Sequence, residues 1–196
     1  MKFYFLKAAF AGLILTVSGL TNATLILEGG TGSTGAGNIL LSGGTVVDVS
    51  NGAYFNGTTT PASDWVWDVA NSNGSANPLL FTFSFSLTGF DVSTAVLTGL
   101  WGIDNVGSVS LNGNILSSLP NVITNNFNVL HAFSAGPGSS AFVAGLNVLS
   151  YNVENRGGPG AFRTSVQVNA NPIPEPSTLA ILGLGLMALV SRRFKK

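Results

Sequence analysis

The sequence predicts an all-β protein: a β-sandwich or jelly-roll body, flanked by an N-terminal signal peptide and a C-terminal transmembrane helix. Three observations support this fold class for residues 24–170. Several segments alternate apolar and polar residues with a period of two, Asn-Gly and Gly-rich sequences separate these segments, and no stretch sustains a helical period. Many short strands at this spacing are typical of sandwiches and jelly rolls.

The clearest alternation lies in Leu80–Leu87, where three phenylalanines and a leucine share one face while Thr and Ser occupy the other. Asn147–Val153 and Ala161–Asn169 repeat this pattern. In chain order, we expect strands at Thr24–Leu27, Thr45–Val49, Asp64–Val69, Leu80–Leu87, Ala95–Trp101, Ser108–Leu111, Ile115–Leu119, Asn128–Phe133, Asn147–Val153 and Ala161–Asn169.

Turn-forming sequences lie between the expected strands. Asn51-Gly52, Asn56-Gly57 and Asn73-Gly74 favour turns because Asn and Gly both tolerate unusual backbone angles. Asn112-Gly113 lies between two short strands, and this arrangement predicts a type I′ hairpin.

The charge distribution argues against several classes of function. The formal net charge of the 196 residues is zero, yet residues 24–172 carry seven acids against two arginines, and the other basic residues lie near the two ends. A body without a basic patch is not expected to bind nucleic acid. The chain has no cysteine and only one histidine, His131, which excludes disulfides and makes most zinc sites improbable. Nucleophilic catalysis is not expected either, because no Gly-x-Ser-x-Gly elbow accompanies His131.

The first 23 residues have the order of a secretory signal peptide. Lys2 and Lys7 give a positive start, Ala8–Leu20 is apolar apart from one Thr and one Ser, and small or polar residues then end at Ala23. We expect cleavage after Ala23. The alternative is an uncleaved membrane helix, which the shortness of the apolar run disfavours.

The last residues of the sequence predict a membrane anchor. A proline-rich spacer begins at Asn171 and leads into Thr178–Val190, an apolar segment that we expect to form a transmembrane helix. This segment is shorter than the about 20 residues of an ordinary span, but flanking arginines can extend to the headgroups. A cytoplasmic basic stop follows, consisting of Arg192, Arg193, Lys195 and Lys196. Because basic ends stay in the cytoplasm, the body should lie across the membrane.

Pro174-Glu175-Pro176, the apolar segment and the basic end together resemble the PEP-CTERM sorting signal over residues 171–196. The resemblance implies a Gram-negative bacterium in which a membrane-embedded exosortase recognises Pro174, Glu175 and Pro176 and removes the span. It also implies a protein of the cell envelope or of the exopolysaccharide matrix. Independently, the prolines keep this spacer extended and poor in backbone donors, which suits recognition by a processing enzyme.

A second resemblance covers roughly residues 64–169. Leu97–Asn114 contains a Trp strand, an Asp-Asn turn and an Asn-Gly hairpin, in the order found in galactose-binding-like jelly rolls, and residues 142–155 fit later strands of such bodies. This resemblance supports the fold and suggests carbohydrate, but it implies no particular binding residues.

Two sets of residues are candidates for ligand binding. Asp64 and Asp68 flank Trp65 and Trp67. In a strand the two acids would share one face, roughly 13 Å apart, and the tryptophans the other. The set could bind sugar, with Trp stacked on the rings, but a pair of core tryptophans below a solvated acidic face is the favoured interpretation.

Asp104 and Asn105 form the second set. Their oxygens could bind Ca²⁺, the one candidate cofactor, or hydrogen-bond a glycan. Such pairs more often cap their own turn through side-chain-to-backbone bonds, which is the interpretation that we favour here.

We therefore expect a non-enzymatic protein that is exported, held in the membrane by its C-terminal helix and processed by an exosortase, with a structural or adhesive body in an exopolysaccharide matrix. The main alternative is a carbohydrate-binding module, either with or without calcium. A secreted hydrolase is the third hypothesis and the least favoured.

Overall fold

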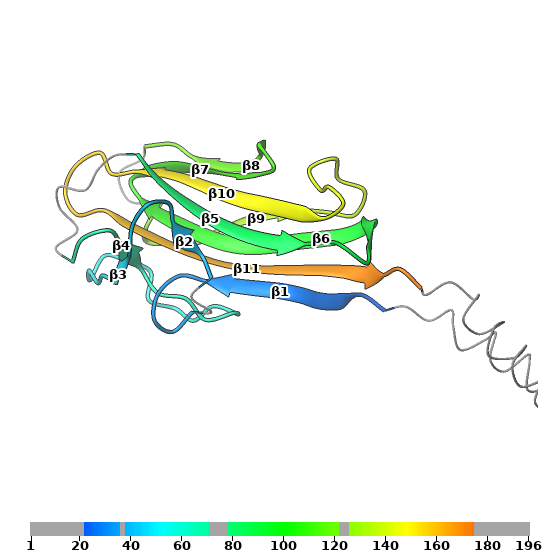
Figure 1. The fold of residues 1–196 in the computed structure, drawn as a ribbon. Helices are drawn as coiled ribbons and strands as arrows, with labels where there is room; N and C mark the ends of the chain where they lie inside the picture. The colour runs from blue at the N-terminus through cyan, green and yellow to red at the C-terminus, as the bar shows by residue number, and fades with distance from the viewer. Residues whose placement is uncertain (1–21, 36–37, 71–77, 122–125, 175–196) are drawn as a thin grey trace, which may run out of the picture. The chain divides into compact units, whose positions relative to one another are not determined.

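A computed structural model describes residues 22–35, 38–70, 78–121 and 126–174 (Figure 1). Residues Ala23–Asn171 form one compact unit. Ala23 and Pro174 are both exposed. The rest of the predicted signal peptide up to residue 21, Glu175, Pro176, the predicted span and the basic stop lie outside the described residues. In the described ranges, no helix is long and apolar enough to cross a membrane.

The body is an all-β sandwich of two antiparallel sheets, without a helix among the described residues. The first sheet has the order β3-β4-β11-β6-β9, and β1 also pairs with β11. Its strands are β1 (Thr24–Gly30), β3 (Val47–Asp48), β4 (Val66–Trp67), β6 (Phe90–Asp104), β9 (His131–Ala135) and β11 (Ala161–Pro172). The second sheet has the order β2-β5-β10-β7-β8. Its strands are β2 (Leu40–Leu41), β5 (Leu79–Ser86), β7 (Val106–Leu111), β8 (Asn114–Leu119) and β10 (Leu146–Glu154).

The apolar faces of the two sheets make a single main core. The phenylalanines of β5 and the inward residues of β10 are fully or almost fully buried, as their alternation predicts. Trp101 of β6 crosses the sandwich and donates from Nε1 to Ser117 Oγ on β8 at 3.2 Å. Tyr151 of β10 reaches the opposite sheet, where Thr164 Oγ1 lies 3.1 Å from its hydroxyl. These bonds satisfy polar atoms that the core would otherwise bury unpaired.

The predicted hairpin at Asn112-Gly113 is confirmed. Asn112 has φ of 49° and Gly113 has φ of 83°, the positive angles that a type I′ turn requires. The turn joins β7 to β8 in the second sheet. The Asn112 side chain is also bonded to the chain outside the hairpin, because Nδ2 donates to the Ala141 carbonyl at 2.8 Å and Oδ1 accepts from the Val148 amide at 2.9 Å.

Strand β11 lies at the centre of the first sheet. It pairs with β1 from Thr24↔Ala170 to Gly30↔Ser165, with β4 at Phe162, and with β6 on its other side. Phe162 of β11 faces the core. The chain that precedes β4 covers the opposite face of β11, so that Arg163 is only 6% exposed. This covering chain builds the site described next.

The strands expected at Thr45–Val49 and Asp64–Val69 are much shorter than predicted, with only two residues each in β3 and β4. The reason lies in the hydrogen bonds of the neighbouring residues. The Asp64 amide donates to the Thr31 carbonyl at 2.8 Å, and the Asp48 carboxylate accepts from Ser33. These residues therefore fix a loop instead of extending the ladder.

Candidate functional site

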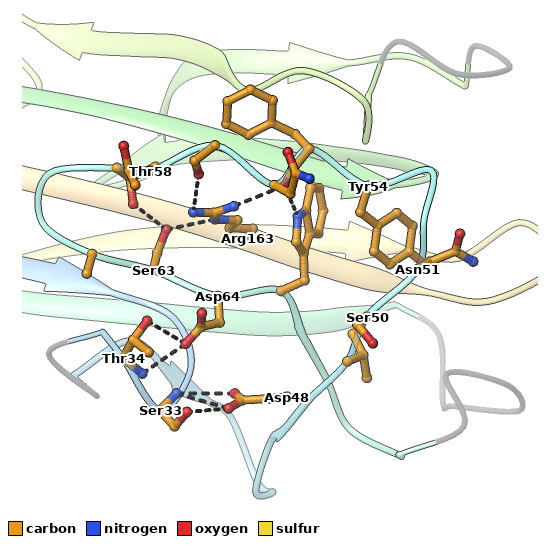
Figure 2. Close-up of a pocket in the computed structure, with 17 residues that line it drawn as sticks. Ser33, Thr34, Asp48, Ser50, Asn51, Tyr54, Thr58, Ser63, Asp64 and Arg163 are labelled. Carbon is orange, nitrogen blue, oxygen red and sulfur yellow. Dashed lines mark hydrogen bonds between the residues drawn. The ribbon is translucent and has the colours of Figure 1, made fainter.

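A surface cavity of about 600 Å³ opens between the chain that connects β3 to β4, the turn after β1 and strand β11 (Figure 2). We call it the loop cavity. Its lining combines carboxylates, hydroxyls, amides, aromatic rings and one guanidinium. The lining residues are Ser33, Thr34, Asp48, Val49, Ser50, Asn51, Tyr54, Phe55, Asn56, Gly57, Thr58, Thr59, Ala62, Ser63, Asp64, Trp65 and Arg163.

Arg163 holds in place the wall of the loop cavity that is formed by residues 55–63. Its guanidinium donates from Nε to Ser63 Oγ at 3.0 Å, from Nη1 to the Phe55 carbonyl at 3.0 Å and from Nη2 to the Gly57 carbonyl at 2.9 Å (Figure 2). Burial lowers the pKa of this arginine, and the negative charge of Asp64 opposes that shift. The side chain remains a cation because an arginine pKa starts far above neutrality. Arg163 thus acts as a clamp on the loop Phe55–Ser63.

The carboxylates of Asp48 and Asp64 build another wall of the loop cavity by holding the turn after β1. Asp64 Oδ2 accepts from the Thr34 amide at 2.8 Å and from Thr34 Oγ1 at 2.6 Å, and Asp48 accepts from the Ser33 amide and hydroxyl. The two carboxylates converge on Gly32, where a Cβ would lie 2.9 Å from Asp48 Oδ1 and 2.9 Å from Asp64 Oδ2. Gly32 also has φ of 83°, so a glycine is needed there for both space and backbone angle. Neither carboxylate has an ion-pair partner among the described residues.

The aromatic residues of the cavity pack on one another and leave little ring surface free. Tyr54 and Trp65 lie with ring centroids 4.9 Å apart, and their side chains are 7% and 6% exposed. Trp65 Nε1 donates to the Phe55 carbonyl at 2.8 Å. Phe55 is half-buried, and its ring lies 5.9 Å from the Arg163 guanidinium carbon. Phe55 is therefore the aromatic ring of this cluster most open to a ligand.

Tyr54 connects the cavity to a buried carboxylate beneath it. The Tyr54 hydroxyl donates to Asp104 Oδ2 at 3.2 Å, and Asn105 Nδ2 donates to Asp104 Oδ1 at 2.6 Å. Asp104 is 6% exposed, and burial raises its pKa to about 6, although the bond from Tyr54 opposes this shift. Burial and the neighbouring Asp104 charge raise the pKa of Tyr54 far above its usual value, so its hydroxyl keeps its proton.

The structure divides the candidate carbohydrate set Asp64, Trp65, Trp67 and Asp68. Asp64 and Trp65 line the loop cavity, whereas Trp67 is fully buried in the main core, where its ring excludes a side chain at Gly160. Asp68 is half-buried outside the cavity, and burial raises its pKa. The expected face of two acids on one strand does not form, because β4 contains only Val66 and Trp67. Trp65 and Trp67 also belong to two separate hydrophobic clusters.

The arrangement at Asp104 and Asn105 does not fit a calcium site. Both Asp104 oxygens accept hydrogen bonds, and Asn105 Oδ1 accepts from the Arg156 amide at 2.7 Å. These oxygens therefore face donors and not a cation. Within the described ranges, no three His, Asp or Glu residues cluster in a way that could hold a metal ion. Asn105 ties the turn after β6 to the chain after β10 instead of capping only its own turn.

Asp48, Tyr54 and Arg163, which help to build the cavity, were not among the candidate site residues of the sequence. Arg163 carries the strongest signal that could have been used. It is one of only two basic residues beside seven acids in residues 24–172, and it lies in a segment that alternates apolar and polar residues. The alternation places Arg163 on the polar face of the strand, which the fold then buries. Its partners, however, are backbone carbonyls more than 100 residues away, which the sequence does not reveal.

The comparison with curated proteins gives no match. Among solved structures, the chain resembles β-sandwich carbohydrate-binding modules. One is the module CBM36 in complex with calcium and xylotriose, at 11% identity and a TM-score of 0.40, covering 74% of this chain and 100% of that one. Another is a family 35 module from an environmental isolate, at 15% identity and a TM-score of 0.42, covering 76% and 99%. A CBM35 from Cellvibrio japonicus has 18% identity and a TM-score of 0.39, covering 76% and 97%.

A family model described as the PEP-CTERM protein-sorting motif matches residues 172–196, beginning at the last residue of β11. The chain therefore carries a PEP-CTERM protein-sorting motif in residues 172–196.

Proposed function

We propose that this is a non-enzymatic envelope protein of a Gram-negative bacterium, exported through its N-terminal signal peptide and processed by an exosortase. The observation that carries the proposal is the sorting motif in residues 172–196. The basic stop holds the end of the chain in the cytoplasm until the segment before it is removed. The β-sandwich then has a structural or adhesive role in an exopolysaccharide matrix. Its acidic, cysteine-free composition suits that environment and needs no oxidising step to fold.

Changing Pro174, Glu175 and Pro176 together to alanine should abolish processing. We expect the variant to stay in the membrane fraction with an intact mass that retains the C-terminal residues, while the native protein loses them. Pro172→Ala, in the same spacer but outside the tripeptide, is the matched control and should be processed normally. Normal trimming of the triple variant would refute the proposal that an exosortase reads these residues.

We propose glycan binding in the loop cavity as a second candidate function. The observation that favours it is the lining of the cavity, where Asp48 and Asp64 carboxylates and several hydroxyls lie beside a half-buried Phe55 ring. Sugar hydroxyls donate well to carboxylates, and aromatic rings pack on the apolar faces of sugars. Pockets with an apolar wall and a few converging polar groups are the usual ligand sites of proteins. Calcium is not part of this proposal.

Asp48→Ala should weaken glycan binding about 10-fold if one charge-assisted hydrogen bond is lost. Asp48 is exposed and lies outside the main core, so its removal should loosen the turn at Ser33 but leave the sandwich folded. Asp91→Ala is the control, because Asp91 is also exposed but lies at the start of β6 and not in the cavity lining. Binding of the processed protein to a panel of matrix polysaccharides measures the effect. Equal losses in both variants would exclude the loop cavity as the site.

A further inference from the structure

The described residues contain three Asn-Gly pairs, and the structure places them in different environments. Asparagine followed by glycine is the sequence most prone to spontaneous loss of the side-chain amide, because glycine has no Cβ to hinder attack by its backbone nitrogen. The attack needs a side chain that is free to rotate over the following peptide. The three pairs are Asn51-Gly52, Asn56-Gly57 and Asn112-Gly113.

Asn112 is held against this reaction. Its Nδ2 donates to the Ala141 carbonyl at 2.8 Å and to Asn147 Oδ1 at 2.8 Å, and its Oδ1 accepts from the Val148 amide at 2.9 Å. Three bonds of ordinary strength must break before the side chain can turn toward Gly113. They should slow the reaction at Asn112 by about 100-fold relative to a free side chain.

Asn51 is held less firmly. It begins a turn in which the Tyr54 amide donates to the Asn51 carbonyl at 3.0 Å, and its Oδ1 accepts from the Ala53 amide at 3.0 Å. One side-chain bond and one turn must therefore open before Gly52 can attack.

Asn56 has no such restraint. Its side chain is exposed at the rim of the loop cavity and makes no hydrogen bond with the described residues. The Gly57 amide likewise donates to none of them, since Arg163 grips this segment only through the Phe55 and Gly57 carbonyls. Arg163 thus holds the chain on both sides of Asn56 through carbonyl groups. The Gly57 nitrogen, which is the nucleophile, and the Asn56 side chain make no hydrogen bond with the described residues.

We propose that Asn56 is a site of spontaneous backbone modification. The Gly57 nitrogen loses its proton to water and bonds to the Asn56 Cγ atom, and the Cγ–Nδ2 bond breaks as Nδ2 takes a proton from water and leaves as ammonia. Water then opens the resulting cyclic imide at one of its two carbonyls. One opening yields aspartate, and the other yields isoaspartate, in which the main chain runs through Cβ and Cγ. No oxidant, reductant or enzyme is required.

The modification acts on the clamp that builds the loop cavity. An isoaspartate adds one methylene to the main chain between the Phe55 and Gly57 carbonyls, which Arg163 holds at 3.0 and 2.9 Å. Both carbonyls cannot then keep their bonds to one rigid guanidinium. Either product also adds a negative charge to a rim that already carries Asp48 and Asp64. A long-lived extracellular molecule would therefore lose its original loop cavity with age.

The test is to hold the full processed protein at mildly alkaline pH and map its peptides by mass spectrometry over time. Enzymatic methylation of isoaspartate identifies that product separately. We expect Asn56 to convert first, Asn51 more slowly and Asn112 about 100-fold more slowly than Asn56. Asn56→Gln is the matched variant, because its longer side chain must form a larger ring and should remain unmodified at this position.

Two outcomes would overturn the proposal. One is an Asn56 that stays intact while Asn51 or Asn112 converts, and the other is equal conversion at all three in the folded protein. Unfolding the protein in denaturant provides the reference, since the three pairs should then react at similar rates. The thermal midpoint of the aged protein should fall, while that of aged Asn56→Gln should not. An equal fall of the two thermal midpoints would show that modification of Asn56 does not disturb the hydrogen bonds of Arg163.

Discussion

Arg163→Met should lower the free energy of unfolding by about 3 kcal/mol, because it removes three hydrogen bonds donated by a buried cation. The variant loses the bonds to Ser63 Oγ and to the Phe55 and Gly57 carbonyls. The Phe55 carbonyl keeps its bond from Trp65 Nε1 and Ser63 Oγ keeps its bond with Thr59 Oγ1, so the Gly57 carbonyl is the acceptor left without a donor. Methionine fills much of the same volume, so the effect reports the lost polar contacts and not a cavity.

Arg156→Met is the matched control for this prediction. Arg156 pairs with Glu154 at 2.9 Å, but its side chain is 53% exposed, and such surface pairs contribute little to stability. Denaturant unfolding of both variants measures the difference. Equal stability of Arg163→Met and Arg156→Met would show that the clamp does not hold the loop. The Arg163 variant should also lose protection from proteolysis between residues 54 and 64, if the loop depends on it.

Asp104→Asn should make the protein more stable at neutral pH, by up to about 3 kcal/mol. The Asp104 pKa is raised from 3.8 to about 6 by burial, so the ionised carboxylate is costly in the folded state. The substituted amide can keep both contacts. Its oxygen can accept from Asn105 Nδ2, and its nitrogen can donate to the Tyr54 hydroxyl, which can turn toward the Pro159 carbonyl at 3.5 Å.

The pH dependence of stability gives an independent check. Between pH 3.8 and about 6 the folded state holds a proton on Asp104 that the unfolded state releases, so lowering the pH through this range adds stability. The stabilisation from this group is complete below pH 3.8 and is lost as the pH rises through about 6. In Asp104→Asn this dependence should disappear, whereas Asp91→Asn should retain it. A native protein whose stability falls steadily from pH 7 to pH 4 and is unchanged by Asp104→Asn would contradict the prediction.

The long strands of the sandwich follow from the sequence because their alternation matches a buried face. Phe81, Phe83 and Phe85 of β5 and Tyr151 of β10 are all buried, and the Asn112-Gly113 turn has the expected backbone angles. The short strands β2, β3 and β4 do not follow in the same way. Each contains two residues whose pairing depends on neighbours far along the chain, so no local periodicity marks their ends.

The candidate site was predictable only in part, for a related reason. Asp64 and Trp65 were identified from the spacing of acids and tryptophans in an expected strand, and both line the cavity. Trp67 and Asp68 were grouped with them because a six-residue strand was expected, yet the chain leaves the sheet directly after Trp67. Arg163 and Asp48 were missed because their partners, the Gly57 carbonyl and Ser33, are brought to them by the fold and not by sequence spacing.

The position of β11 has a mechanical consequence for a protein tethered through the residues that follow it. A pull on the end of β11 acts along the strand, which is paired with β1 from Ala170 to Ser165 and with β6 on its other side. Such a load shears many ladder bonds at once and cannot peel them apart one by one. A tether at this end of the body would therefore pull on a strand that is hydrogen-bonded on both sides.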